Sequence, residues 1–518
     1  MSGNHARRRV GPATALAVVS SSVFMAMLDN LAMNNALPRI GTEMGLGVSG
    51  LQWVVAGYTL PFAACLLSGS VLGDRLGQRR AFLAGVLAFC AGSAFGALAA
   101  NGACLVAGRV VQGLGAAVLM PPSMALLRHV FTDPQLRTRA MGVRGGAGGL
   151  GVALGPTVGG PLVDALGWRS IMWINVPVGV AVFLLALRTL PDVPPAPARW
   201  DPRGQLLAVT GLGGLVYGLV QGPVDGWTDP AVLATLGLAA LALPAFAVAE
   251  ARGTAPMLEV RLLRDPVTAA AATACFAAGL GLFGSVFFLT LYLQNILGWS
   301  ATGAGAVFLT ASALIALTAP LAGALCARHG VRLPLVCGPV LCAVALLGLS
   351  GHGRDAAYGS YGWLLPVLGT GVGLTFVSAV IATVQRAPAD RTAMASAFMD
   401  TLRELGGVVG VAALGAVLTG RMRLSLHDRA VAGGLPEGRA HDLVESVLRH
   451  GAAAGLERAA PGRVTAAAGT WVEQSFVAGL HLALFSGALV LFGATAVVTL
   501  LLRGDRAVAA EQPLPQTG

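Results

Sequence analysis

The stretch 27–38, MLDNLAMNNALP, sets one carboxylate, Asp29, inside an apolar run that extends over residues 13–37. This run is long enough for a membrane-spanning helix, which takes about 20 residues, and too long for the apolar region of a typical cleaved signal peptide. Asp29 lies about two-thirds of the way along it. A charged side chain at that depth is unfavourable unless it is paired, hydrated or protonated. The stretch therefore predicts a membrane helix with a specific task for Asp29.

The same kind of apolar run recurs along the whole chain. Runs of about 20 residues, the length of a membrane span, lie at 13–37, 51–72, 81–100, 103–127, 140–163, 170–190, 204–221, 231–249, 266–291, 302–327, 331–350, 361–384, 404–420 and 477–502. The run 204–221 is the weakest, and without it and its neighbour the chain would have twelve spans. The pattern predicts an all-α polytopic membrane protein with fourteen transmembrane helices.

Composition supports this prediction. The 518 residues are 55% hydrophobic and 11% charged, whereas soluble proteins carry roughly 25% charged residues. All 34 basic residues are arginine, so a P-loop lysine or a lysine nucleophile is excluded. We attribute the missing lysine to a GC-rich bacterial genome. The net charge of +10 follows from membrane topology, so we expect no nucleic-acid partner.

The arginines also predict the orientation. With residues 1–12 in the cytoplasm, arginines gather in the cytoplasmic loops and tails, and the short outer loops hold only Arg39, Arg169 and Arg354. Such an excess of positive charge is typical of cytoplasmic loops. We therefore expect a multi-pass protein of the inner (plasma) membrane with both termini in the cytoplasm. The segment 421–476, in which acidic residues offset the arginines, is predicted to be an external, partly helical element.

Enzyme motifs are weak or missing. Gly146, Gly148 and Gly151 form a G-x-G-x-x-G pattern, but no strand precedes it, as a dinucleotide site requires. No H-E-x-x-H or G-x-S-x-G pattern occurs. The seven cysteines lie in or beside the apolar runs, as inert core residues do. The sequence predicts no enzyme activity, no cofactor and no metal site.

Arg109 is the second deep charge, within the run 103–127. Arginine does not deprotonate, so Arg109 needs an anion, a carbonyl group or water, and Asp29 is the natural candidate. Because burial favours the neutral form of a carboxylate, proton uptake by Asp29 would release Arg109. The alternative is a fixed structural pair. Gln112 shares the helix face of Arg109.

Several segments together resemble the major facilitator superfamily, and within it the 14-span drug:proton antiporters. The resemblance rests on the first-span motif Asp29, Asn34, Ala36, Leu37 and Pro38; the loop signature Leu72, Asp74, Arg75, Gly77, Arg79 and Arg80; the fourth-span motif Arg109, Gln112, Gly113, Gly115 and Pro121; and the antiporter motif Gly151, Gly155, Pro156, Gly159 and Gly160. Weaker matches are Trp168-Arg169 to Asn175-Val-Pro177, Tyr292 to Ser300, and Arg403 with Gly406, Gly407 and Gly410.

The resemblance also shows departures. Ser70 and Leu31 replace the usual glycine and threonine, and Glu404 stands where glutamine is expected. Glu404 is either a third proton-coupling group, beside Asp29 and Arg109, or an interfacial charge that answers Arg403.

An internal repeat supports a duplicated architecture. Gly323, Leu325, Arg328, Gly330 and Arg332 echo the loop signature, with Ala327 in the place of Asp74. Such repeats are typical of transporters built from two related halves. We expect the major facilitator fold: a first six-helix half over 1–190, a linker and two inserted helices over 191–250, a second six-helix half over 251–502 with the external loop 421–476, and a cytoplasmic tail over 503–518.

Each motif suggests a role. The resemblance implies that Asp74, Arg75, Gly77, Arg79 and Arg80 form a cytoplasmic gate, through ion pairs of Asp74 at the helix ends. Glycines spaced by four residues allow close helix contact, so the antiporter motif predicts either a hinge between the halves or simple packing.

The substrate cavity is expected among inward polar and aromatic residues: Asn34, Tyr58, Gln112, Tyr292 and Gln294. Trp53, Trp168 and Trp299 are predicted to be anchors at the membrane interface.

The resemblance thus implies a monomeric, proton-coupled exporter of amphipathic or hydrophobic small molecules, such as antibiotics, with protons and the lipid bilayer as its other partners. A dedicated exporter of a single natural product, siderophore or lipid is the first alternative. A membrane-embedded enzyme or sensor is the second.

Overall fold

The computed structural model describes residues 11–195, 200–253, 260–354, 356–387, 392–459 and 465–503. Within these residues every regular element is helical. Thirteen helices are long and apolar enough to cross a membrane, or fourteen if the two segments of α2 count as one span. The predicted all-α polytopic fold is confirmed. Arg7, Arg8, Arg9, Arg506, most of the predicted tail and part of the linker lie outside the described residues.

Eight of these helices lie between residues 12 and 252, and the other elements lie between residues 260 and 501. The first group is α1 (Pro12–Met44), α2 (Val48–Leu76), α3 (Gln78–Ala97), α4 (Gly102–Val130), α5 (Pro134–Leu166), α6 (Arg169–Thr189), α7 (Pro202–Asp225) and α8 (Pro230–Arg252). The second is η1 (Val260–Arg264), α9 (Pro266–Leu291), η2 (Tyr292–Ile296), α10 (Ala301–His329), α11 (Arg332–Leu349), α12 (Tyr358–Tyr361), α13 (Leu364–Arg386), α14 (Thr392–Ala432), α15 (Glu437–His450), α16 (Ala452–Ala459) and α17 (Thr465–Leu501).

Asp-Pro pairs start four of these helices. In α5, α7, α8 and α9 an aspartate side chain accepts hydrogen bonds from the first free backbone N–H groups, and proline follows at the first helical position. Proline lacks an N–H that would need a partner there, and its fixed φ suits a helix. These helix starts are therefore encoded locally.

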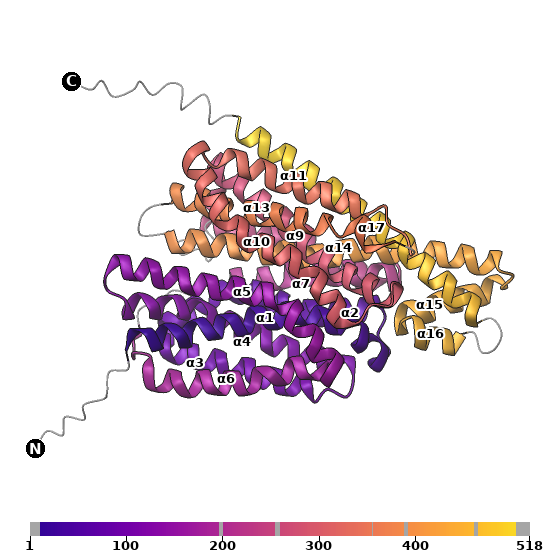
Figure 1. The fold of residues 1–518 in the computed structure, drawn as a ribbon, viewed down its shortest axis with the longest axis horizontal. Helices are drawn as coiled ribbons and strands as arrows, with labels where there is room; N and C mark the ends of the chain where they lie inside the picture. Colours follow the sequence, from indigo (N-terminus) through magenta and orange to yellow (C-terminus); the bar gives the residue numbers. More distant parts are fainter. Residues whose placement is uncertain are drawn as a thin grey trace, which may run out of the picture.

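The helices form two bundles. Figure 1 shows α1 and α3–α6 in indigo to magenta on one side and α9, α10, α11, α13, α14 and α17 in pink to yellow on the other. Within the first bundle α1 packs on α5, and α4 packs on α2 and α3. Between the bundles α5 packs on α10 and α2 on α14. This is the expected arrangement of two six-helix units.

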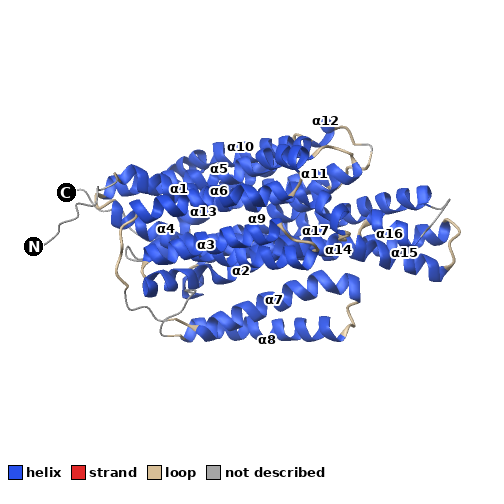
Figure 2. Ribbon diagram, turned by 90° about the horizontal axis from the view of Figure 1, so that it is seen from below, coloured by secondary structure: helices blue, strands red, loops and turns tan. Residues whose placement is uncertain are grey.

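The inserted pair α7–α8 lies along one edge of the molecule (Figure 2). α7 contacts α2 and α14, with Val216 and Val220 in an apolar cluster that includes Ala56 and Val408. The weakest predicted span, 204–221, is therefore a full helix, and it packs where the two bundles meet.

The segment 421–476 extends beyond the bundle. The predicted span 404–420 is only the middle of α14, and α17 starts twelve residues before the predicted run 477–502. Both helices continue past their apolar stretches, and α15 and α16 lie at the end of the molecule opposite the start of α1 and the end of α17 (Figure 1). Hydropathy finds the membrane-embedded part of a helix and misses such polar continuations.

Candidate functional site

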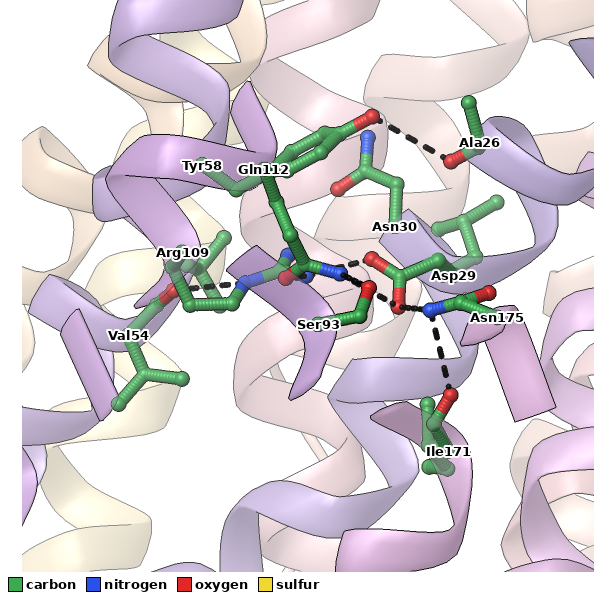
Figure 3. Close-up of polar contacts among 12 residues, drawn as sticks. Ala26, Asp29, Asn30, Val54, Tyr58, Ser93, Arg109, Gln112, Ile171 and Asn175 are labelled. Atoms are coloured by element: carbon green, nitrogen blue, oxygen red, sulfur yellow. Dashed lines mark hydrogen bonds and ion pairs between the residues drawn. The ribbon is translucent and has the colours of Figure 1, made fainter. Parts of the chain in front are cut away.

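The two deep charges predicted from the sequence meet in the first bundle. Arg109 of α4 donates from Nη1 to Oδ2 of Asp29 in α1 at 2.5 Å, and both side chains are fully buried. Figure 3 shows the two side chains pointing toward each other between the helices. Charged hydrogen bonds of this length are among the strong ones.

Two further donors reach the second carboxylate oxygen. Asn175 of α6 donates from Nδ2 to Oδ1 of Asp29 at 2.6 Å, and Gln112 of α4 donates to the same oxygen at 3.4 Å. Gln112 is itself held by Ser93 of α3, whose hydroxyl accepts from its Nε2 at 2.6 Å (Figure 3). Donors to both oxygens favour the charged carboxylate. Sequence reasoning quoted Asn175 as part of a family segment but gave it no role, and it missed Ser93.

Arg109 has other partners besides Asp29. Its Nε donates to the carbonyl of Val54 at 3.3 Å, its Nη1 to Gln112 at 3.1 Å, and its guanidinium lies 4.4 Å from the ring centre of Tyr58. Nη2 is buried and has no hydrogen-bond partner among the described residues. If the bond to Asp29 broke, Arg109 would still have these neutral contacts. None of its described contacts would supply another negative charge.

A second buried charge cluster lies on α14. Glu404 is 2% exposed and accepts from Arg403 at 2.9 Å, and Arg403 also pairs with Asp400 at 3.1 Å. The Arg403 guanidinium lies over the ring of Phe376 in α13. Glu404 is therefore buried and paired with Arg403. Its part in coupling stays a prediction.

The loop signature forms the tight α2–α3 connection. Gly77 has φ +90°, a conformation that favours glycine, and it lets α3 start one residue later. Asp74 accepts from Gln78 at 2.7 Å, and Arg79 donates to the carbonyl of Leu187. Among the described residues, the expected ion pairs of Asp74 with Arg79 and Arg80 are not formed in this conformation. Gln78, the first residue of α3, is instead the side chain that binds Asp74 across the α2–α3 connection.

The antiporter motif faces two helices. A Cβ at Gly151 would lie 2.6 Å from the carbonyl oxygen of Phe24, and one at Gly155 2.9 Å from Cβ of Leu31, so both glycines allow α1 to approach α5. Gly159 does the same at Ala32. Gly160 instead faces α10, where a Cβ would lie 2.5 Å from the carbonyl oxygen of Ala301. The motif packs α5 within its own bundle and against the other bundle.

Contacts between α5 and α10 concentrate at one end of the molecule. Asp164 accepts from the N–H of Ala301 at 3.2 Å and from the N–H and hydroxyl of Thr302 at 2.9 and 2.6 Å. Toward the other end, where arginines lie at the helix ends, a Cβ at Gly146 of α5 or Gly323 of α10 would meet nothing within 4 Å. The bundles therefore touch at the end opposite the arginine-rich one. Sequence reasoning missed Asp164, because its partner is 138 residues away.

The residues expected to line the substrate cavity do not all lie together in the structure. Tyr58 and Gln112 lie beside the charge pair, and Asn34 bonds back to its own helix at Asn30. Gln294 donates to the carbonyl of Asn35 at 3.1 Å and lines an open pocket beside the contact of Asp164 with α10.

Tyr292, the remaining member, donates to the carbonyl of Gly353 at 2.6 Å, outside the first bundle. The cavity set was inferred from residue type, which does not fix the side of a helix.

Trp168 corrects another expectation. It is 1% exposed, and its indole donates to Glu43 at 2.8 Å, so it is not an exposed interfacial anchor. Trp53 packs against Tyr217 of α7, and Trp299 against Tyr358. In the described residues no group of three or more His, Cys, Asp or Glu side chains is placed to hold a metal ion.

Comparisons with known proteins agree with this architecture. The family model described as Major Facilitator Superfamily matches residues 19–411. The multidrug resistance protein Stp of Mycobacterium tuberculosis is 37% identical over 79% of this chain and 77% of its own length. The tetracenomycin C resistance and export protein of Streptomyces glaucescens is 32% identical over 97% and 94%, and the methylenomycin A resistance protein of Bacillus subtilis 35% over 78% and 87%.

Solved structures show the same fold at low identity. An inward-facing bacterial homologue of the lysosomal transporter Spinster matches with a TM-score of 0.66 and 16% identity, over 95% of this chain and 97% of the other. The POT family transporter PepTSo matches with a TM-score of 0.65 and 14% identity, over 95% and 98%.

Proposed function

The chain belongs to the major facilitator superfamily of membrane transporters, and we propose that it is a proton-coupled antiporter that exports amphipathic or hydrophobic small molecules by alternating access. The observation that carries the proposal is the fully buried pair of Asp29 and Arg109 inside a multi-span protein. Intramembrane ionisable residues commonly mark proton or substrate paths. The names of the relatives, which refer to multidrug resistance and antibiotic export, support the substrate class.

The pair provides two states. When Asp29 is charged, its Oδ2 lies 2.5 Å from Nη1 of Arg109 and balances the arginine charge. When Asp29 takes up a proton, the attraction falls away while Arg109 stays charged, and its set of partners must change. A proton gradient can bias such a two-state element. Glu404, also buried and paired with an arginine, is the proposed second coupling group. The function is transport rather than an enzymatic reaction.

Orientation follows from the arginines. The arginine-rich end, where α1 begins, is proposed to face the cytoplasm, with both termini on that side of the plasma membrane of a GC-rich bacterium. The contacts of Asp164 with Thr302 then hold the outer side closed in this conformation. We place the halves at 1–190 and 251–502, with 191–250 between them, and expect a monomer.

Replacing Asp29 tests the proposal. Asp29→Asn keeps the size and an acceptor for Arg109 but does not titrate, so proton-driven efflux should be lost while the protein still accumulates in the membrane. The assay is drug susceptibility and dye efflux in a host without its own efflux pumps. Asp229→Asn, at an exposed helix start in α8, is the matched control. Wild-type efflux by Asp29→Asn would contradict the proposal.

Export of one natural product is the second candidate. Two relatives carry the names of single antibiotics, tetracenomycin C and methylenomycin A. The same susceptibility panel separates the two candidates, because a multidrug exporter protects against several unrelated compounds and a dedicated exporter against one.

A further inference from the structure

The start of α6 is tied to α1 at two depths. Near the outer end, Trp168 and Arg169 both donate to Glu43 of α1, at 2.8 and 3.2 Å. Less than two helical turns further on, Asn175 reaches Asp29, also on α1. The segment Trp168–Pro177, which the family resemblance left without a role, is therefore the part of α6 that contacts the candidate proton carrier.

The Asn175 amide is fixed by two acceptors. Its Nδ2 donates to Oδ1 of Asp29 at 2.6 Å and to the carbonyl of Ile171 at 3.3 Å. Both partners accept hydrogen bonds and have no proton to give, so the amide nitrogen rather than its oxygen must face them. Asn175 is 1% exposed, and Figure 3 shows it on the side of Asp29 away from Arg109.

Asp29 therefore has one oxygen for each type of partner. Oδ2 binds Arg109, and Oδ1 accepts from Asn175 and more weakly from Gln112. A proton placed on Oδ1 would meet the N–H of Asn175 in the same position. A proton on Oδ2 shares that oxygen with the guanidinium and removes the negative charge that holds Arg109.

We propose that Asn175 is a positioning residue that directs the proton to Oδ2 of Asp29, the oxygen that binds Arg109, so that proton uptake weakens the ion pair directly. The inference rests on the proposed function. It assigns to Asn175 two effects: it stabilises the charged carboxylate through a hydrogen bond, and it links the titration of Asp29 to the ion pair. No proton binds Asn175 itself.

Other groups near Asp29 do not replace this donor. α4 presents Arg109, and α2 presents Tyr58, whose ring centre lies 4.4 Å from the Arg109 guanidinium and whose hydroxyl donates to the carbonyl of Ala26. α3 presents Ser93, bound to Gln112, and Cys90, whose thiol donates to the Asn175 carbonyl. α5 packs its glycines against this part of α1. Among the described uncharged donors, Asn175 thus makes the shortest hydrogen bond to the Asp29 carboxylate.

The test is the pH profile of transport in proteoliposomes, with Asn175→Leu as the first variant. Leucine has a similar size and no donor, so Asp29 should bind protons about tenfold more tightly and the pH of half-maximal transport should rise by about one unit. Asn175→Ser keeps a shorter donor, and its profile should lie between the two. The control is Thr290→Val, which removes the fully buried hydroxyl of a residue on α9.

The outcomes separate the two proposals. An upward shift in Asn175→Leu with an unshifted profile in Thr290→Val supports the positioning role. A reduced rate at every pH with an unchanged midpoint overturns it, since that is what a structural defect produces. If Asn175→Leu does not accumulate, the midpoint of Asn175→Ser decides in the same way. If Asp29→Asn retains proton-driven transport, the proposed function itself fails, whatever Asn175 does.

Discussion

Asp164 at the end of α5 binds Thr302 at the start of α10 through both the backbone N–H (2.9 Å) and the hydroxyl (2.6 Å). The two residues belong to different bundles, so the carboxylate of Asp164 caps N–H groups of α10 in addition to the cap that Ser300 provides within its own helix start. In an alternating-access cycle this contact has to break whenever the outer side opens.

Asp164→Ala should therefore favour the outward-open form. Losing the cap on exposed groups removes about 1–2 kcal/mol, so the labelling rate of Ala301→Cys by an outside maleimide should rise several-fold in a protein without native cysteines. Ala301 is buried in the present conformation. Asp229→Ala removes a similar cap inside the α7–α8 pair, and it should leave the rate unchanged. Equal rates in all variants would exclude a gating role for Asp164.

The buried charge pair should show an asymmetry. Asp29→Leu leaves Arg109 charged and buried, whereas Arg109→Leu leaves Asp29, which can become neutral by binding a proton. Removing one partner of a buried pair destabilises by about 3–5 kcal/mol, and Asp29→Leu should fall at the upper end. The double variant Asp29→Leu/Arg109→Leu should recover much of the lost stability, but it should not transport. Thermal unfolding in detergent measures each step.

Two glycines of α5 should respond differently to the same change. Gly155→Val inserts a side chain where Cβ alone would lie 2.9 Å from Leu31, and overpacking of this kind destabilises by about 1–3 kcal/mol. Gly146→Val enters open space and should alter the unfolding temperature little. If both variants unfold alike, close packing of α1 on α5 is not what the motif provides.

The stability of the hairpin α15–α16 should depend more on its close packing at Gly47 than on its ion pair with Asp225. Gly47 donates to the carbonyl of Arg449 at 3.1 Å, and a Cβ at Gly47 would overlap the carbonyl oxygen of Leu448. Gly47→Ala should lower hydrogen-exchange protection of α15 by about 1–3 kcal/mol. The half-exposed ion pair of Arg449 with Asp225 should contribute less than about 1 kcal/mol.

The comparison variants for the hairpin are Arg449→Ala and Gly438→Ala. Gly438 lies in α15 with no atom near its added Cβ, so its substitution should be neutral. Greater loss of protection in Arg449→Ala than in Gly47→Ala would reverse the ranking.

Sequence patterns predicted local features well. Apolar runs located the spans, because the bilayer sets a minimum length for them. The low charge content made Asp29 and Arg109 conspicuous, and the structure places them in contact. Their neighbours were harder to assign. Asn175 and Ser93 are ordinary polar residues in apolar helices, and nothing in their own surroundings shows which helix they face.

Trp168 and Tyr292 show the same limit. Tryptophan near a helix start suggests an interfacial anchor, yet Trp168 is covered because Glu43 of α1 offers an acceptor. Tyr292 was grouped with Tyr58 by chemistry, but its hydroxyl binds the loop at Gly353.

By itself the sequence determined the number and type of the helices, the arginine-rich end and the two charges that need a partner, because hydropathy, helix capping and the penalty for buried charge act within one segment. Tertiary structure alone decided that Asn175 and Arg109 bind different oxygens of Asp29 and that Asp164 caps α10. These contacts join residues 80 or more positions apart. Their geometry depends on how the helices rotate and cross, which packing of the whole bundle sets.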